Sequence, residues 1–163
     1  MRAYFDSGFL FKLYWQEANT PAAQTIVLQY QPPILLSRFN EVEMLHVARR
    51  KTWLLGPTGQ PLLTAVQLHL GMALLEQDLA NGIVARLEVD YEEVFAAALE
   101  LSRKHGQTIP VKTADLLHVA MMEFGFDDFV TADRQQHDFA TRAGLHSVLL
   151  PPLIPRGTRQ GRV

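Results

Sequence analysis

The stretch "DDFVTADRQQHDFATRAGLHSVLL", residues 127–150, decides the fold that the sequence predicts. It begins with a short apolar run at residues 128–132 and continues with helical spacing over residues 133–144. It closes on a second apolar run at residues 145–150. A strand, a helix and a second strand in this order predict a βαβ unit with parallel strands. Asp133 then stands where the first strand ends and the helix begins.

The same alternation continues toward the N-terminus. Apolar runs at residues 2–5 and 32–37 are each followed by a helical pattern, and residues 83–90 read as a strand or an edge segment. Further helices are predicted over residues 20–30, 62–81, 91–106 and 113–125. The order predicts an α/β fold, a three-layer α/β/α sandwich with a mainly parallel sheet. One domain is expected over residues 1–150, followed by a loose tail, rich in proline and arginine, at residues 151–163.

Composition excludes several classes of site. The chain has 163 residues, of which 48% are apolar and 20% charged, as in ordinary globular proteins. The absence of cysteine excludes disulfides, thiolate zinc sites and a cysteine nucleophile, and it fits the cytoplasm. No apolar run is long enough to span a membrane, and Asp6 interrupts the first one, so we expect neither a signal peptide nor membrane association. A net charge of −2 means that any binding to nucleic acid depends on local basic patches.

Four acidic residues stand where a site is expected. Asp6 and Asp133 follow strands, Asp115 lies in the first turn of a helix, and Glu43 lies inside the helix after residues 32–37. Parallel strands end at one edge of a sheet, and ligands bind there. Carboxylates that converge repel each other, and a divalent cation removes that penalty. Mg²⁺ in particular prefers such oxygen ligands.

The alternative for each aspartate is a structural one. Asp6 and Asp133 stand at positions that cap the helices following them, and Asp115 at a helix N-terminus is favoured by the helix dipole. Glu43 is in mid-helix and has no such explanation. Glu41, two residues earlier, is the alternative to Glu43 as the site acid.

Four segments resemble the PIN domain family, and they occur in the family's order. They are "YFDSGFLFKLYWQE", "NEVEMLHVARRK", "TADLLHVA" and "FVTADRQQHDFATRAGL", which together span about residues 2 to 150. The likeness is closest to the VapC-like toxin branch, the toxins of bacterial toxin–antitoxin pairs. In the pattern of that branch the Glu is followed by Leu-x-x-Ala-x-Arg; with Glu43 in place, Arg49 matches the Arg, while Val47 replaces the usual Ala.

The resemblance implies a Mg²⁺- or Mn²⁺-dependent endoribonuclease. Water would attack the RNA phosphodiester in line, with no covalent intermediate and with a carboxylate that orients or deprotonates the water. The implied metal-binding and catalytic residues are Asp6, Glu43, Asp115 and Asp133. Ser7 and Thr131 would be polar helpers beside the metal. The implied partners are an RNA substrate and a cognate antitoxin protein.

Further residues extend this hypothesis. His118 lies three residues after Asp115 on the same helix face. We expect it to pack near the site and to form hydrogen bonds there; the alternative is a role as a metal ligand. A homodimer is expected. The apolar stripe on the first helix, Phe9, Leu10, Leu13 and Tyr14, is expected first to be buried within the monomer, and its extension into a dimer interface is the alternative. The residues proposed to contact RNA phosphates are Arg49, Arg50, Lys51 and Arg134. For the basic run at the end of the helix, the alternative role is to stabilise the helix end through the helix dipole. For Arg134 it is an ion pair with an acidic neighbour.

Two other functions compete with the nuclease. The first is a catalytically silent PIN-like binding module whose acidic pocket holds a partner protein. The second is a phosphate-transfer enzyme that uses Asp6 as its nucleophile. Such enzymes usually place a second acid close to the nucleophile, and "FDSGF" at residues 5–9 has none. A phosphate-binding glycine loop and a Gly-x-Ser-x-Gly elbow are both missing from the sequence.

Overall fold

Parallel strands form the centre of the fold, as predicted. The computed structural model describes residues 1–152. Its strands are β1 (Ala3–Phe5), β2 (Ile34–Ser37), β3 (Val84–Leu87), β4 (Asp128–Thr131) and β5 (Ser147–Leu149). β4 pairs in parallel with both β1 and β5, and β2 pairs in parallel with β3 and lies beside β1. The segment 83–90, for which the sequence allows a strand or an edge segment, contains the strand β3. The predicted loose tail lies, from residue 153 onward, outside the described residues.

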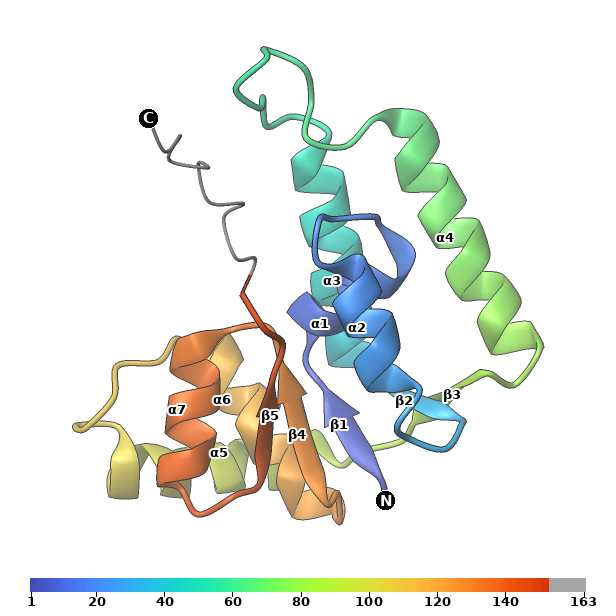
Figure 1. Cartoon of the computed structure of the whole chain (residues 1–163). Helices are drawn as coiled ribbons and strands as arrows, with labels where there is room; N and C mark the ends of the chain where they lie inside the picture. The colour runs from blue at the N-terminus through green and yellow to red at the C-terminus, as the bar shows by residue number, and fades with distance from the viewer. Residues whose placement is uncertain (153–163) are drawn as a thin grey trace, which may run out of the picture.

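Helices cover both faces of this sheet, which confirms the three-layer arrangement (Figure 1). They are α1 (Ser7–Tyr14), α2 (Thr20–Val27), α3 (Arg38–Lys51), α4 (Ala65–Ala80), α5 (Tyr91–His105), α6 (Thr113–Ala120), η1 (Met121–Phe124) and α7 (Arg134–Arg142). Side chains of a strand alternate between the two faces. Phe5 and Val130 accordingly pack in the core with α1 to α4, whereas Tyr4 and Phe129 pack with α5 to α7.

The predicted helix over residues 113–125 is divided in two. α6 ends at Ala120 and a 3₁₀ turn, η1, follows. Gly125 then stops the helical path with a left-handed φ of 78°, a conformation that glycine adopts without strain. The chain enters β4 directly afterwards.

The stripe on α1 that was the candidate dimer interface is core instead. Phe9 and Leu10 are 0% and 1% exposed and pack in the cluster that also holds Trp15. Trp15 is buried against Gly71 of α4, where helix and ring approach closely. Burial within the monomer, the first expectation for these residues, is therefore the one observed.

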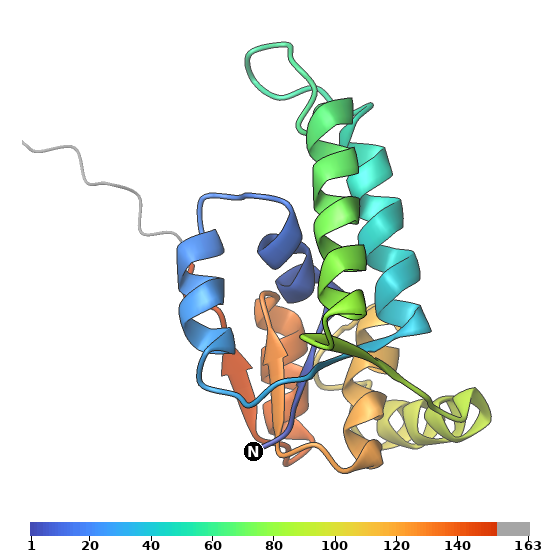
Figure 2. The same cartoon turned by 90° about the vertical axis from the view of Figure 1, so that its right-hand side faces the viewer.

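α3 and α4 lie side by side and project beyond the sheet, joined by the loop of residues 52–64 (Figure 2). α3 begins at a capping box in which Ser37 and Asn40 exchange hydrogen bonds. Thr64 and Gln67 do the same at the start of α4. In the part of the chain that the structure describes, none of the helices has the length and apolar character needed to cross a bilayer.

Candidate functional site

All four predicted acids line one cavity of about 360 Å³. Asp6 directly follows β1 and Asp133 follows β4, so both lie at the carboxyl edge of the sheet. Glu43 reaches the cavity from α3 and Asp115 from α6. Figure 1 shows the ends of β1 and β4 next to the start of α1 and beside α3. The parallel topology thus brings together residues that are far apart in the sequence.

Asp6 is the most deeply buried of the four, with 4% of its surface exposed. Its Oδ1 accepts the Phe9 N–H at 2.6 Å, so the predicted cap of α1 is real. Its Oδ2 lies 2.7 Å from the Thr131 hydroxyl. Burial raises the pKa of Asp6, and the hydrogen bonds from Thr131 and Phe9 only partly oppose that rise. Asp6 is therefore at once a cap and a poorly solvated carboxylate facing a cavity.

Glu43 is held by His118. The Glu43 Oε2 lies 2.5 Å from the His118 Nε2. Burial acts to raise the pKa of Glu43, but the hydrogen bonds from His118 and Ser7 prevail and lower it. His118 is itself only 2% exposed. Glu43 therefore faces the cavity as a carboxylate with a fixed donor behind it.

Asp115 and Asp133 complete the acidic wall. Asp133 caps α7, since its Oδ1 accepts the N–H groups of Gln135 and Gln136 at 2.7 and 3.2 Å. Asp115 accepts the Lys112 N–H at 3.2 Å at the start of α6. Burial raises the pKa of Asp115, the Lys112 N–H opposes that rise, and the negative charge of Asp133 adds to it. The charge of Asp133 is thus close enough to disfavour the ionisation of Asp115.

Basic residues also line the cavity. Glu17 accepts hydrogen bonds from Lys12 and Lys51, both at 2.5 Å, and so links α1 to α3. The Lys51 ammonium group also lies 4.9 Å from the centre of the Phe11 ring. All four of these residues line the cavity. An anionic ligand entering the cavity would therefore meet two ammonium groups as well as the carboxylates.

The other predicted residues fall into separate groups. Glu41 does not line the cavity; it pairs with Arg38 and Arg86 at 2.9 and 2.6 Å, and these partners lower its pKa. The geometry therefore favours Glu43 over Glu41. Arg49 and Arg50 are exposed on the last turn of α3, and Arg134 is exposed at the start of α7.

Sequence reasoning missed several polar residues of the site. Gln136 is buried, lines the cavity and places its Oε1 2.6 Å from the Thr131 hydroxyl. Asn40 donates to the Phe5 carbonyl at 3.1 Å and so fixes α3 against β1. Gln136 follows Asp133 by three residues, which places it on the same helix turn. That spacing is the one signal in the sequence that points to it.

The residues fit a divalent cation by type and by position. Carboxylate oxygens are the ligands that Mg²⁺ and similar ions prefer, and within residues 1–152 no Lys, Arg or His side chain forms an ion pair within 4 Å with Asp6, Asp115 or Asp133. Each acid instead accepts hydrogen bonds from its own donors. In the described part of the chain, no three Asp, Glu or His side chains are close enough together, as they stand, to bind one ion. Binding therefore requires side chains of this cavity to turn toward one another.

A comparison with known families covers the part of the chain that contains this cavity. The PIN domain profile matches residues 3–142, a range that contains the four acids of the cavity. No curated protein matches the chain. PIN domains are generally nucleases and typically bind divalent metals. With a match over most of its 163 residues and a parallel sheet whose carboxyl edge carries the acids, the chain belongs to the PIN domain family.

Proposed function

We propose that this protein is a Mg²⁺- or Mn²⁺-dependent endoribonuclease that hydrolyses RNA phosphodiester bonds. The observation that carries the proposal is the single cavity lined by Asp6, Glu43, Asp115 and Asp133 together with the ammonium groups of Lys12 and Lys51. Carboxylates hold the metal that phosphoryl transfer needs, and cations attract the RNA backbone.

The acids of the cavity have two proposed roles, which are to bind divalent cations and to accept a proton from the attacking water. Asp6, Glu43, Asp115 and Asp133 would hold divalent cations, which supply stabilisation of the negative charge on the reacting phosphoryl group. Thr131 orients Asp6, and Ser7 with His118 orients Glu43. A carboxylate of the cavity accepts the proton of the attacking water.

The test is cleavage of a structured RNA by the purified chain, measured with added Mn²⁺ and again with EDTA. We expect cleavage with Mn²⁺ and none with EDTA. The alternative, a silent PIN-like binding module, uses the same acidic pocket to hold a basic partner protein. It predicts no cleavage under either condition, so the two functions separate in this assay. Cleavage that EDTA leaves unchanged would overturn the metal-dependent mechanism.

Asp133 offers a way to separate metal binding from helix capping. Asparagine caps a helix as well as aspartate does, while alanine loses about 1 kcal/mol, or roughly 2–4 °C of melting temperature in a chain of this size. We therefore expect Asp133→Asn to lower Mn²⁺ affinity at an unchanged melting temperature, and Asp133→Ala to lower both. Titration calorimetry and thermal melts measure the two quantities.

Asp90 provides the matched control for this pair. It caps α5 through the Glu92 N–H at 2.9 Å and does not line the cavity. Asp90→Ala should therefore cost similar stability and leave Mn²⁺ affinity unchanged. Wild-type Mn²⁺ affinity in Asp133→Asn would remove this residue from the proposed ligand set.

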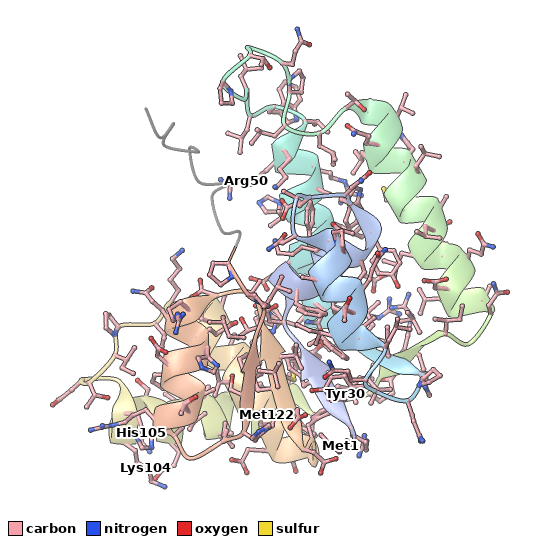
Figure 3. The ribbon with its side chains drawn as sticks, viewed as in Figure 1. Met1, Tyr30, Arg50, Lys104, His105 and Met122 are labelled. Atoms are coloured by element: carbon pink, nitrogen blue, oxygen red, sulfur yellow. The ribbon has the colours of Figure 1, made fainter. Side chains whose placement is uncertain are left out.

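We further propose that Arg49, Arg50, Lys51 and Arg134 contact RNA phosphates. Arg49 and Arg50 continue α3 beyond Glu43, and Arg134 follows Asp133 directly. Figure 3 shows Arg50 at the end of the molecule opposite Lys104 and His105. Lys51 already pairs with Glu17, so the exposed arginines are the clearer test.

Replacing Arg49, Arg50 and Arg134 together by alanine should weaken RNA binding about tenfold at moderate salt. The slope of log affinity against log salt should also fall by about 0.7 for each arginine that binds a phosphate in the wild type. Fluorescence anisotropy with labelled RNA at several salt concentrations measures both quantities. Lys104→Ala on α5 is the control, because Lys104 pairs with Glu100 away from the cavity. An unchanged salt slope in the triple variant would contradict binding of phosphates by these arginines.

We also propose a role as the toxin of a type II toxin–antitoxin pair, acting as a homodimer and covered by a cognate antitoxin. An exposed apolar stripe on α4 supports a protein partner: Val66, Leu70 and Leu74 are 69%, 65% and 43% exposed. Trp53 on the adjoining loop is 85% exposed. Solution mass of the purified chain tests the homodimer, and growth arrest on expression that a neighbouring gene relieves tests the toxin role.

A further inference from the structure

His118 connects the acidic cavity to the buried side of the sheet. Its Nε2 lies 2.5 Å from Glu43 and 3.1 Å from the Ser7 hydroxyl. Its Nδ1 lies 2.8 Å from the Tyr4 hydroxyl. The Phe39 ring packs against the imidazole with 4.6 Å between ring centres. Both ring nitrogens therefore have a defined partner, and the ring has little room to turn.

The chemistry of the two partners sets the direction of these hydrogen bonds. A carboxylate can only accept, so the nitrogen that faces Glu43 must carry a proton. In a neutral imidazole the other nitrogen, Nδ1, is then an acceptor. Tyr4 is 0% exposed, and its phenol carries the proton that Nδ1 needs. The only arrangement of a neutral ring that satisfies both contacts runs from Tyr4 O–H to Nδ1 and from Nε2–H to Glu43.

We propose that Tyr4 and His118 act together as positioning residues that hold Glu43 toward the cavity for metal binding. Tyr4 donates to Nδ1 and so anchors the His118 ring, and His118 then presents its Nε2–H to the carboxylate. This inference rests on the proposed function only in treating Glu43 as a metal ligand. Donors behind a ligand typically change metal affinity by about 10- to 100-fold when they are removed.

Removing the Tyr4 hydroxyl would act through the position of the ring. Nδ1 is then a buried acceptor without a donor, and the contact that anchors this side of the imidazole is lost. Nε2–H is no longer held in line with the Glu43 carboxylate, from which Nε2 lies 2.5 Å in the wild type, so Glu43 loses the donor that fixes its position. A role limited to packing predicts none of this, because phenylalanine keeps the ring that contacts Phe126 and Phe129.

Tyr30 supplies the matched control. Its hydroxyl also donates to a buried carboxylate, that of Asp128, at 2.6 Å. Tyr30 does not line the acidic cavity but a second pocket, formed with residues of the N-terminal segment and β2. Tyr4→Phe and Tyr30→Phe therefore each remove one hydrogen-bonded hydroxyl group, and only the first touches the proposed relay.

The experiment uses the full chain and two readouts that do not depend on cleavage. Nitrogen NMR of the histidine rings in the metal-free protein reports which nitrogen of His118 is protonated, and calorimetry reports Mn²⁺ affinity. We expect a protonated Nε2 and an unprotonated Nδ1 in the wild type. Tyr4→Phe should shift the His118 Nδ1 resonance, because that nitrogen loses its donor, and should lower Mn²⁺ affinity about tenfold, while Tyr30→Phe should match the wild type.

Substitutions of His118 complete the test. Glutamine places an amide N–H where Nε2–H was, so His118→Gln should keep nearly full Mn²⁺ affinity, and adding Tyr4→Phe should then have no further effect. His118→Leu should lower the affinity about 10- to 100-fold. Should leucine prevent folding, the tyrosine and glutamine variants still decide the outcome.

The results separate the relay from the proposed function. A wild-type chain that binds no Mn²⁺ overturns the proposed metal site, and the His118 tautomer and the shift of its Nδ1 resonance in Tyr4→Phe then decide whether the relay exists. A chain that binds Mn²⁺ but shows Nδ1 protonated, or equal affinities for Tyr4→Phe and Tyr30→Phe, overturns the relay and leaves the proposed function standing.

Discussion

Replacing Asp6 by asparagine is expected to abolish RNA cleavage while raising the melting temperature of the metal-free protein. The loss should reach about 1,000-fold or more, because a metal-holding carboxylate supports several kcal/mol of transition-state stabilisation. The gain in stability has a separate cause, which lies in the hydrogen bonds around Thr131.

The Thr131 hydroxyl has one proton and two acceptors. It lies 2.7 Å from Asp6 Oδ2 and 2.6 Å from Gln136 Oε1, and its own oxygen accepts the Asp133 N–H at 2.9 Å. When Asp6 is ionised, one of the two acceptor contacts has no proton. Asparagine removes the conflict, since its Nδ2 donates to Thr131, Thr131 donates to Gln136, and its Oδ1 still caps α1. One such buried hydrogen bond contributes about 1 kcal/mol, or roughly 2–4 °C of melting temperature.

The pH dependence of stability follows from the same carboxyl group. Burial raises the pKa of Asp6 above its ordinary value of 3.8 in the folded state. The folded chain therefore holds this proton more tightly than the unfolded chain does, and the associated stability is fully present below pH 3.8. It is lost as the pH rises through the raised pKa. Asp6→Asn removes this loss of stability. The difference in melting temperature between Asp6→Asn and the wild type should therefore grow as the pH rises through the raised pKa of Asp6.

Thermal melts in EDTA at several pH values and cleavage assays with Mn²⁺ measure the two effects. Asp115→Asn should also abolish cleavage, because it removes a second acid from the same cavity. Asp138→Asn on α7 is the control, since Asp138 does not line the cavity. Full cleavage by Asp6→Asn or Asp115→Asn would contradict the proposed nuclease site, and a lower melting temperature for Asp6→Asn would contradict the account of Thr131.

Gly71→Ala is expected to destabilise the fold by about 1–3 kcal/mol, the usual cost of overpacking a core. A Cβ at Gly71 would lie 2.3 Å from the Trp15 Nε1, so either the ring or α4 must move. The ring cannot move easily, because Trp15 is 1% exposed and stacks on Phe11 with 5.0 Å between ring centres. In most helices the same change is stabilising, since alanine is the better helix former. The sign of the effect thus reports the close approach of α4 to the Trp15 ring.

Denaturant unfolding measures this loss, and two comparisons interpret it. Gly8→Ala adds a Cβ to another helical glycine at an ordinary contact distance, 3.5 Å from the Asp6 Oδ2, and should cost little. Combining Gly71→Ala with Trp15→Phe should recover part of the stability, because the smaller ring leaves room for the methyl group. A Gly71→Ala chain as stable as the wild type would show that α1 and α4 separate without cost.

The fold class was predictable because it depends on local patterns. Residues 127–150 alternate strand, helix and strand in a way that only a parallel crossover satisfies, and the structure has β4, α7 and β5 there. The sequence allows Asp6 and Asp133 to be caps or site acids, and the structure places each in a cap and in the cavity wall. The two roles do not exclude each other, because a carboxylate has two oxygens and can serve both.

Other features could not be predicted from the sequence, because they depend on how helices and strands are oriented relative to one another when they pack. Glu41 and Glu43 are two residues apart on one helix, about 200° around its axis, and only the packing of α3 decides which faces the cavity. The division of the predicted helix into α6 and η1 after Ala120 is also visible only in the structure. Glu17 joins Lys12 of α1 to Lys51 of α3, and these helices share no sequence pattern.

By itself, then, the sequence determined the order of strands and helices, the parallel sheet and the edge at which Asp6 and Asp133 lie, since these follow from periodicity and from residues at element ends. Only the tertiary structure decided the partners of the acids. Thr131 and Asp6 are 125 positions apart, and His118 and Glu43 are 75 apart. Contacts of this kind depend on side-chain directions across packed elements, which local spacing does not encode.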